Sequence, residues 1–277
     1  MPRASANGVE LEYEIFGAPN GTPLLLINGL GAQMIGWDDD FCRLLVDRGF
    51  RVIRFDNRDA GLSTRPHEPY TLDEMAGDAA GLLDRLGIPA AHVVGASMGG
   101  FIAQLVALNH PDRVLSLTSI MSGPSGEDQV PPTDEARALL FAPAPETREE
   151  RIAQGVQAKQ KLLGPADPFD EPYERARIAA AVDRAYNPAG FIRQLQAIAA
   201  APGRLQRLRS LRVPTLVLHG DADDLIPVEN GRNVAAAIPG ARRVEIEGMG
   251  HDVPRRVWTQ VADEIAALAQ QAAATAC

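Results

Sequence analysis

The stretch Val93-Val94-Gly95-Ala96-Ser97-Met98-Gly99-Gly100 decides the fold, because it reads as a strand, a Gly-x-Ser-x-Gly turn and a helix. The strand starts at Ala91, and an apolar helical pattern follows the turn and stops before Pro111. This order predicts a serine on a sharp strand-to-helix turn, with its hydroxyl projecting above the sheet. The motif alone is weak, since a glycine-rich turn can simply pack a helix close to a strand. In this context it marks Ser97 as a candidate nucleophile.

Length and composition indicate an ordinary globular chain. Of its 277 residues, 45% are hydrophobic and 23% charged, and the formal net charge is −9. An acidic balance argues against nucleic acid as a partner, because phosphate groups require a basic face. Residues 1–8 lack the apolar core of a signal peptide, and the longest strongly apolar run, 24–27, is too short for a bilayer. We expect a cytoplasmic monomer or small homo-oligomer without membrane contact, with Cys42 buried and no disulfide framework.

Strand and helix patterns alternate along the first part of the chain. Strands are predicted at 9–15, 24–27, 51–55, 91–94 and 114–120, and helices at 37–48, 71–86 and after Ser97. The helix at 71–86 is the clearest, because Thr71 and Glu74 form a capping box before an apolar face. Strands that alternate with helices of this length form right-handed β-α-β units. The sequence therefore predicts an α/β fold with a mostly parallel, doubly wound sheet.

The alternation breaks between residues 123 and 204. This proline-rich segment has no convincing strand, and its helical patterns fall at 133–141, 146–163, 171–186 and 188–200. Strands then resume at 213–218 and 243–246, before a final amphipathic helix. We predict an α/β core made of 1–122 and 205–277 and a helical cap, or lid, at 123–204. A separate helical domain is the alternative.

A serine nucleophile needs a base that takes its proton, and histidine is the usual one because its pKa lies near neutrality. Among the five histidines, His219 and His251 both follow late strands. The carboxyl ends of parallel strands share one edge of the sheet, so both could approach Ser97. His251 is favoured because it lies in a glycine-rich turn and follows an acidic loop. This gives the chain order serine, acid, histidine.

The loop after the strand at 213–218 is expected to supply the orienting carboxylate. It contains Asp221, Asp223 and Asp224, so the residues alone leave the choice of acid open. His219 beside three aspartates also suggests a metal site, but the acids crowd one short loop and lack a recognisable ligand spacing. We expect neither a metal nor an organic cofactor.

An oxyanion hole requires two backbone amides. Met98 directly follows the candidate nucleophile, so its amide is the first expected donor. The second is expected from the glycine-rich turn at 28–31, which follows the strand at 24–27. Leu30 is the best candidate there, because a glycine on either side lets the backbone approach closely. The alternative is that these glycines merely make a turn.

Together these motifs resemble those of the α/β-hydrolase family over residues 9–269. The matching pieces are Asn28-Gly-Leu-Gly31, Phe55-Asp-Asn-Arg-Asp-Ala-Gly-Leu-Ser63, Gly95-Ala-Ser-Met-Gly-Gly100, His219-Gly-Asp-Ala-Asp-Asp-Leu-Ile-Pro227 and Gly248-Met-Gly-His251. The resemblance implies that Asp223 completes a triad with Ser97 and His251. It also places Asp56 and Arg58 in a structural turn beside the site. The Asp-x-Arg-Asp form of that turn is most similar to the branch of polyketide methylesterases and carboxylesterases.

One position departs from the family pattern, which usually has His-Gly before the oxyanion turn where this chain has Asn28-Gly29. Because the donor is a backbone amide, the hole can survive, and Asn28 either changes how the turn is braced or offers a polar group to substrate. The resemblance implies a serine hydrolase that cleaves carboxylic esters of small or medium apolar molecules through an acyl-enzyme. The alternatives are a C–C bond hydrolase, a lactonase or a cofactor-free perhydrolase on the same triad, or a non-catalytic small-molecule receptor.

Overall fold

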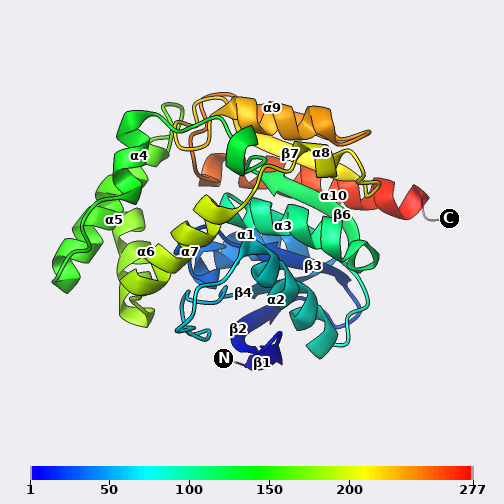
Figure 1. Ribbon diagram of the computed structural model, residues 1–277, viewed down its shortest axis with the longest axis horizontal. Helices are drawn as coiled ribbons and strands as arrows, with labels where there is room; N and C mark the ends of the chain where they lie inside the picture. The colour runs from blue at the N-terminus through cyan, green and yellow to red at the C-terminus, as the bar shows by residue number, and fades with distance from the viewer. Residues whose placement is uncertain (1, 276–277) are drawn as a thin grey trace.

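Residues 2–275, the part of the chain that the computed structural model describes, form an eight-stranded sheet with helices on both faces (Figure 1). The strands are β1 (Arg3–Ala6), β2 (Val9–Phe16), β3 (Thr22–Ile27), β4 (Phe50–Phe55), β5 (Ala91–Ala96), β6 (Val114–Ile120), β7 (Thr215–Gly220) and β8 (Arg242–Ile246). Their order is β1-β2-β4-β3-β5-β6-β7-β8. Strands β3 to β8 are parallel, whereas β2 pairs antiparallel with β1 and β4. The predicted mostly parallel α/β sheet is confirmed.

Two helical layers bury the sheet from opposite sides. One layer contains α2 (Leu72–Arg85), α3 (Met98–Asn109) and α9 (Val228–Ala237), and the other contains α1 (Asp39–Val46) and α10 (Trp258–Thr275). Successive residues of β3 alternate between the two cores, with Leu25 on the α3 side and Leu24 on the α1 side. A strand covered on both faces has no solvated positions. This explains its uninterrupted apolar sequence.

Helices α1 and α2 each begin directly after a capping residue. The predicted capping box is present at α2, where the Thr71 side chain accepts from the Glu74 amide and the Glu74 carboxylate accepts from the Thr71 amide. Helix α1 starts later than predicted, because a short 3-10 helix, η1 (Met34–Gly36), precedes it and Asp38 then caps it.

Cys42 is buried on α1, as predicted. No helix within residues 2–275 is long and apolar enough to cross a membrane.

Strand β1 is absent from the sequence prediction. It forms a hairpin with β2 through Asn7 and Gly8, whose φ values of 48° and 80° are both positive. Two consecutive positive φ angles define a type I′ turn, which favours Asn-Gly. The Asn7-Gly8 dipeptide therefore indicates a hairpin. The prediction missed it because residues 1–8 are polar and show no apolar strand pattern.

Residues 123–204 contain four longer helices and no strand, as predicted. These are α4 (Asp134–Leu140), α5 (Arg148–Leu162), α6 (Glu171–Arg184) and α7 (Pro188–Ala200). Helices α4, α5 and α6 lie to one side of the sheet, on the left in Figure 1. The remaining short helices are η2 (Pro111–Arg113), η3 (Gly126–Asp128), α8 (Leu205–Leu208) and η4 (Arg255–Val257).

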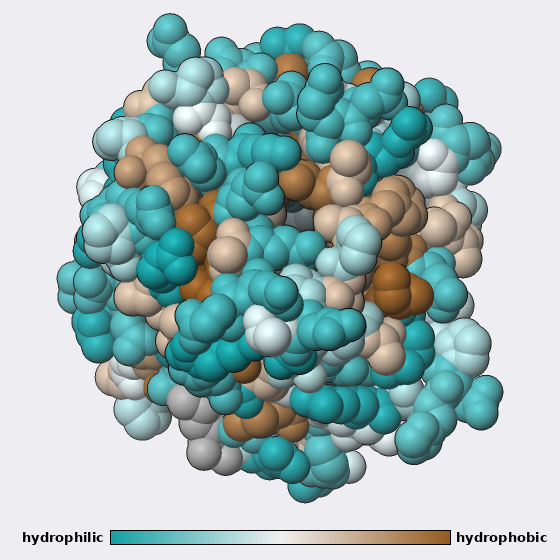
Figure 2. Space-filling view, turned by 90° about the vertical axis from the view of Figure 1, so that its left-hand side faces the viewer, coloured by the Kyte–Doolittle hydropathy of each residue, from teal (hydrophilic) through white to brown (hydrophobic). Residues whose placement is uncertain are grey.

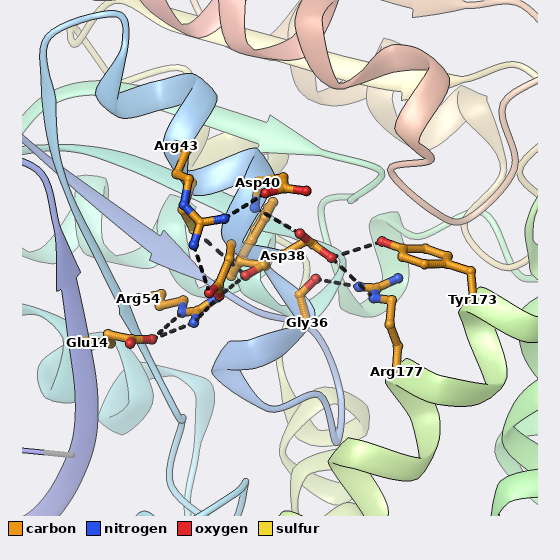
Figure 3. A network of polar contacts seen from close by, with 11 residues as sticks. Glu14, Gly36, Asp38, Asp40, Arg43, Arg54, Tyr173 and Arg177 are labelled. Carbon is orange, nitrogen blue, oxygen red and sulfur yellow. Dashed lines mark hydrogen bonds and ion pairs between the residues drawn. The ribbon is translucent and has the colours of Figure 1, made fainter.

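Polar contacts join these helices to the core, and Figure 3 shows one group of them. The Tyr173 hydroxyl of α6 lies 2.9 Å from the Asp38 carboxylate, and the Arg177 guanidinium donates to the Gly36 carbonyl at 3.0 Å. On the core side of the same network, Arg54 donates to Asp39 at 2.7 Å. The start of α1 and the segment before it are thus held from both sides, by the sheet and by α6.

Candidate active site

Ser97 occupies the turn between β5 and α3, as predicted. Its φ of 57° and ψ of −123° are unfavourable for a residue with a side chain, so the turn persists only because its surroundings fix it. The Ser97 amide donates to the Ile120 carbonyl at 3.0 Å. A Cβ atom at Gly95 would lie 2.0 Å from the Gly99 carbonyl oxygen, so only glycine fits there. These constraints hold the serine at the carboxyl end of β5.

A continuous chain of hydrogen bonds links three predicted residues. The Ser97 Oγ lies 2.9 Å from Nε2 of His251, and Nδ1 of His251 lies 2.8 Å from Oδ2 of Asp223. An ionised carboxylate can only accept, so Nδ1 carries the imidazole proton and Nε2 accepts from the serine hydroxyl. The arrangement is that of a nucleophile, a base and an orienting acid.

Asp223 is buried and its oxygens are fully engaged. Oδ1 accepts from the amides of Leu225 and Ile226 at 2.9 and 2.8 Å, while Oδ2 accepts from His251 and lies 3.3 Å from Nε2 of His219. Burial by itself would raise the pKa of Asp223, but the two histidines outweigh it and hold that pKa well below its usual value. The carboxylate therefore stays ionised through the neutral pH range.

The rival residues of the same loop have other partners. His219 is buried, and its Nε2 lies 2.7 Å from the Ile226 carbonyl oxygen, where it contacts Asp223 rather than Ser97. Asp221 accepts from the Gly248 amide at 2.6 Å and so braces the turn that precedes His251. Asp224 is exposed. Within residues 2–275, no group of three His, Cys, Asp or Glu side chains is placed to hold a metal ion.

The two amides expected to bind an oxyanion belong to residues that are next in the chain to Ser97 and to Gly29, which approaches Ser97. Met98 is the first residue of α3, and neither its amide nor that of Leu30 donates a hydrogen bond within the described residues. The turn that carries Leu30 is closed by a bond from the Ala32 amide to the Gly29 carbonyl at 3.2 Å. A Cβ atom at Gly29 would lie 3.1 Å from Cβ of Ser97, which shows how closely this turn approaches the serine.

Comparison with known proteins agrees with this geometry. The family model described as alpha/beta hydrolase fold matches residues 22–254. The chain belongs to the α/β hydrolase family.

Its relatives have several named activities. The chain is 36% identical to the rhodomycin D methylesterase of Streptomyces peucetius, with 94% of each chain covered. It is 32% identical to a putative carbamate hydrolase of Azorhizobium caulinodans, with 91% of each covered. Among solved structures, the enol-lactonase of Burkholderia xenovorans LB400 superposes with a TM-score of 0.78 at 28% identity, covering 99% of this chain and 100% of that one.

In this α/β hydrolase, the side chain of Asn28 braces the turn that follows β3. Its Oδ1 accepts from the Gly29 amide at 2.9 Å, and its Nδ2 donates to the Gln33 carbonyl at 2.8 Å. Asn57 holds the Asn28 carbonyl from the next loop at 3.0 Å. Of the two roles predicted for Asn28, the structure thus supports bracing.

The predicted structural turn after β4 supports the same region of the hydrolase. The buried carboxylate of Asp56 accepts from the Met34 amide at 2.7 Å and from the Leu62 amide at 2.9 Å. Arg58 forms a buried, bidentate ion pair with Asp78 of α2, at 2.7 and 2.6 Å. This loop therefore ties the residues after the Leu30 turn to the core helices.

Two cavities of unequal size lie near these loops. The larger, of about 390 Å³, is bounded by Gly31 and by residues of 59–61 on the core side. Its other walls are mainly apolar and come from residues 123–204, whose helices α4 to α7 are here called the inserted helices: Leu139, Leu140, Phe141, Tyr186, Phe191 and Ile192. Figure 2 views the side of the molecule that carries α4 to α6, where apolar patches interrupt a mainly hydrophilic surface. The smaller, of about 70 Å³, is lined by Asn28, Trp37 and Ala96 among others.

Two glutamines of the region escaped the sequence reasoning. Gln33 donates to the Ala181 and Ala185 carbonyls at the end of α6, and Gln194 of α7 accepts from the Gly31 amide. The available signal for Gln194 was its place on the helix face that also carries Gly190 and Ala197. An amide on a buried face indicates a specific polar partner.

Proposed function

We propose that this hydrolase cleaves carboxylic esters of small or medium apolar molecules through an acyl-enzyme. Ser97 is the nucleophile, His251 the general base and acid, and Asp223 the group that orients His251. The observation that carries the proposal is the unbroken chain of hydrogen bonds from Ser97 Oγ through His251 to Asp223, at 2.9 and 2.8 Å. The ionised, buried carboxylate of Asp223 favours the tautomer that this chemistry needs.

The reaction proceeds in two halves. Ser97 Oγ attacks the acyl carbon while His251 Nε2 takes the hydroxyl proton, and the amides of Leu30 and Met98 stabilise the oxyanion. The attack gives a tetrahedral intermediate. Its collapse breaks the bond between the acyl carbon and the alkoxy oxygen, which receives the proton from His251 and leaves as the alcohol. Water then attacks the acyl-enzyme, giving its proton to His251, and the acid departs as Ser97 regains its hydrogen.

We assign the two parts of the ester to the two cavities, whose linings include Gly31 of the turn after β3 and Ala96 next to Ser97. The larger one, of about 390 Å³, would hold an apolar body, and the smaller one, of about 70 Å³, would hold a small group. A relative with 36% identity is named a rhodomycin D methylesterase, so methyl esters are the first substrates to test. We also propose that residues 123–204 act as a cap that sets substrate choice. The rival substrates for the same triad are carbamates, lactones and compounds cleaved at a bond between two carbon atoms.

Labelling combined with a substrate panel tests the function. A fluorophosphonate probe should label Ser97 alone, as identified by mass spectrometry of the digested protein. Methyl and p-nitrophenyl esters should be turned over faster than carbamates, lactones or vinylogous diketones. Selective turnover of a rival class would reassign the reaction, and no labelling of Ser97 would favour a binding protein without catalysis.

A further inference from the structure

A buried glutamine on α7 lies between the inserted helices and the catalytic loops. Gln194 has no exposed surface, and it shares the buried face of α7 with Gly190 and Ala197. Burying an amide costs free energy unless its polar atoms find partners, and an apolar residue would fill this position more simply. The side chain therefore marks a position where a particular pair of hydrogen bonds matters.

Both polar atoms of Gln194 contact the core. Oε1 accepts from the Gly31 amide at 2.7 Å, and Nε2 donates to the Arg58 carbonyl at 2.8 Å. Gly31 lies in the turn after β3, and Arg58 lies in the turn after β4. A single side chain of the inserted segment thus joins the two loops that end neighbouring parallel strands.

The contacted turn is the one expected to bind the oxyanion. Leu30 and Gly31 are its central residues, and the positive φ of 67° at Gly31 is that of a type II turn. The Gly31 amide belongs to the central peptide of this turn and is next in the chain to the peptide that carries the Leu30 amide, so an acceptor for the Gly31 amide fixes the turn beside Leu30. A Cβ atom at Gly31 would lie 2.8 Å from the Phe191 ring of α7. The turn is therefore enclosed between α7 on one side and Ser97 on the other.

We propose that Gln194 is a positioning residue, which holds the turn so that the Leu30 amide faces the developing oxyanion. The inference rests on the proposed ester hydrolysis through Ser97. Because the oxyanion exists only after attack, loss of this support should lower kcat with little change in KM. The free energy of unfolding should fall by no more than it does on loss of another buried contact between residues 123–204 and the core.

The test compares Gln194→Met with Asn230→Leu. Methionine keeps the length of the side chain and removes both hydrogen bonds. Asn230 of α9 is the matched control, because it is equally buried and also joins the core to residues 123–204 by two hydrogen bonds, both to the Val130 backbone at 2.7 and 3.0 Å. Misplacement of one oxyanion donor should reduce kcat about thirtyfold in Gln194→Met. Phosphorylation of Ser97 by diethyl p-nitrophenyl phosphate should slow by a similar factor, because its phosphoryl oxygen occupies the same place. The Asn230 variant should keep wild-type rates.

A second variant adds a readout that a purely structural role would not move. In Gln194→Glu, a protonated carboxyl group can accept from Gly31 and donate to the Arg58 carbonyl, whereas the carboxylate cannot donate. Burial raises the pKa of a carboxyl group, so the ratio of variant to wild-type kcat should increase as pH falls from 8 to 6. If Gln194→Met does not fold, this ratio decides, and a flat ratio overturns the proposal.

The outcomes separate the two proposals. If the wild-type protein reacts with the organophosphate at Ser97 and Gln194→Met reacts at the same rate, the positioning role is wrong and the proposed function stands. If the wild-type protein does not react at Ser97, the proposed function fails, and the positioning role fails with it.

Discussion

The helices of the sheet core and the helices of residues 123–204 are stabilised by different kinds of contact. Ten of the twelve residues of α3 are buried, whereas Glu174 is the one buried residue among the fourteen of α6. Helix α6 instead contacts the core through polar groups, such as the ion pair of Arg184 with Asp56 at 2.8 Å. The hydrophobic effect therefore stabilises the core, whereas directional polar contacts fix the position of α6.

Under the proposed function, this difference separates chemistry from substrate choice. Ser97, Asp223 and His251 all lie on loops of the core, while the inserted helices line one side of the larger cavity. The two regions still meet at the catalytic loops, since the Gly250 amide donates to the Leu163 carbonyl at 3.2 Å. Changes to the residues of the inserted helices that line the cavity should thus alter selectivity, whereas changes to Ser97, Asp223 or His251 should abolish turnover.

The largest effect that the comparison predicts is on Ser97. Ser97→Ala removes the nucleophile and should reduce turnover by about 10⁶, because the remaining groups cannot form an acyl-enzyme. The melting temperature should not fall, since the substitution removes only the hydroxyl group and leaves no sizeable cavity. Steady-state kinetics and thermal denaturation measure both quantities. Substantial residual turnover would place the chemistry elsewhere in the molecule.

The next largest effect separates the aspartates of one loop. Asp223→Asn keeps the shape but loses the charge that orients His251, so turnover should fall by up to about 10⁴. Asp221→Asn alters only the brace on the Gly248 amide and should cost about tenfold or less, as changes to a supporting contact commonly do. Comparison of kcat for the two variants decides the point. A crippled Asp221 variant beside an active Asp223 variant would show that the triad acid is wrongly assigned.

Local patterns were sufficient to predict most of the core. The elbow at Ser97, the capping box at Thr71 and the strand-helix alternation are each written in a few neighbouring residues, so the parallel sheet followed from them. The sequence order of serine, acid and histidine likewise predicted contacts that the structure places at 2.8 and 2.9 Å. Strand β1 was missed because a polar edge strand lacks the apolar run on which the prediction relied.

Contacts between distant segments could not be predicted in this way. Gln194 meets Gly31 across 163 positions of the sequence, and nothing in the spacing of either residue specifies that pairing. The choice of Asp223 over its neighbours needed the family resemblance, since the loop residues alone left it open. Long-range polar contacts depend on how α7 lies against the core, which the apolar pattern of a helix does not determine.

A third, smaller effect concerns the stability of the core. His92 on β5 is buried beside Ser116, and burial lowers its pKa from 6.5 to about 4. Between these pH values the unfolded chain binds a proton that the folded chain does not, so stability falls as pH drops from 6.5 towards 4. At pH 4.5 this should cost on the order of 2 kcal/mol.

His92→Gln should remove this acid sensitivity while leaving turnover unchanged, because residue 92 lies near the start of β5, at the opposite end of the strand from Ser97. Urea denaturation of both proteins at pH 7.5 and pH 4.5 measures it. An equal loss of stability in the two proteins would assign the acid sensitivity to groups other than His92.

The smallest effect on stability is expected at the cavity wall. Phe141 is 68% exposed and lines the larger cavity, so Phe141→Ala should leave the melting temperature nearly unchanged. Loss of that apolar wall should raise KM for a bulky aromatic ester by about fivefold, because a large ring contributes at most a few kcal/mol when it is fully covered. KM for p-nitrophenyl acetate, which is too small to reach this wall, should stay the same.

Leu115→Ala is the matched control, since Leu115 is also exposed but lies outside this cavity. If the two variants show the same selectivity, the larger cavity does not hold substrate. Substrate choice would then lie in the core loops, and the division between the two regions would be wrong.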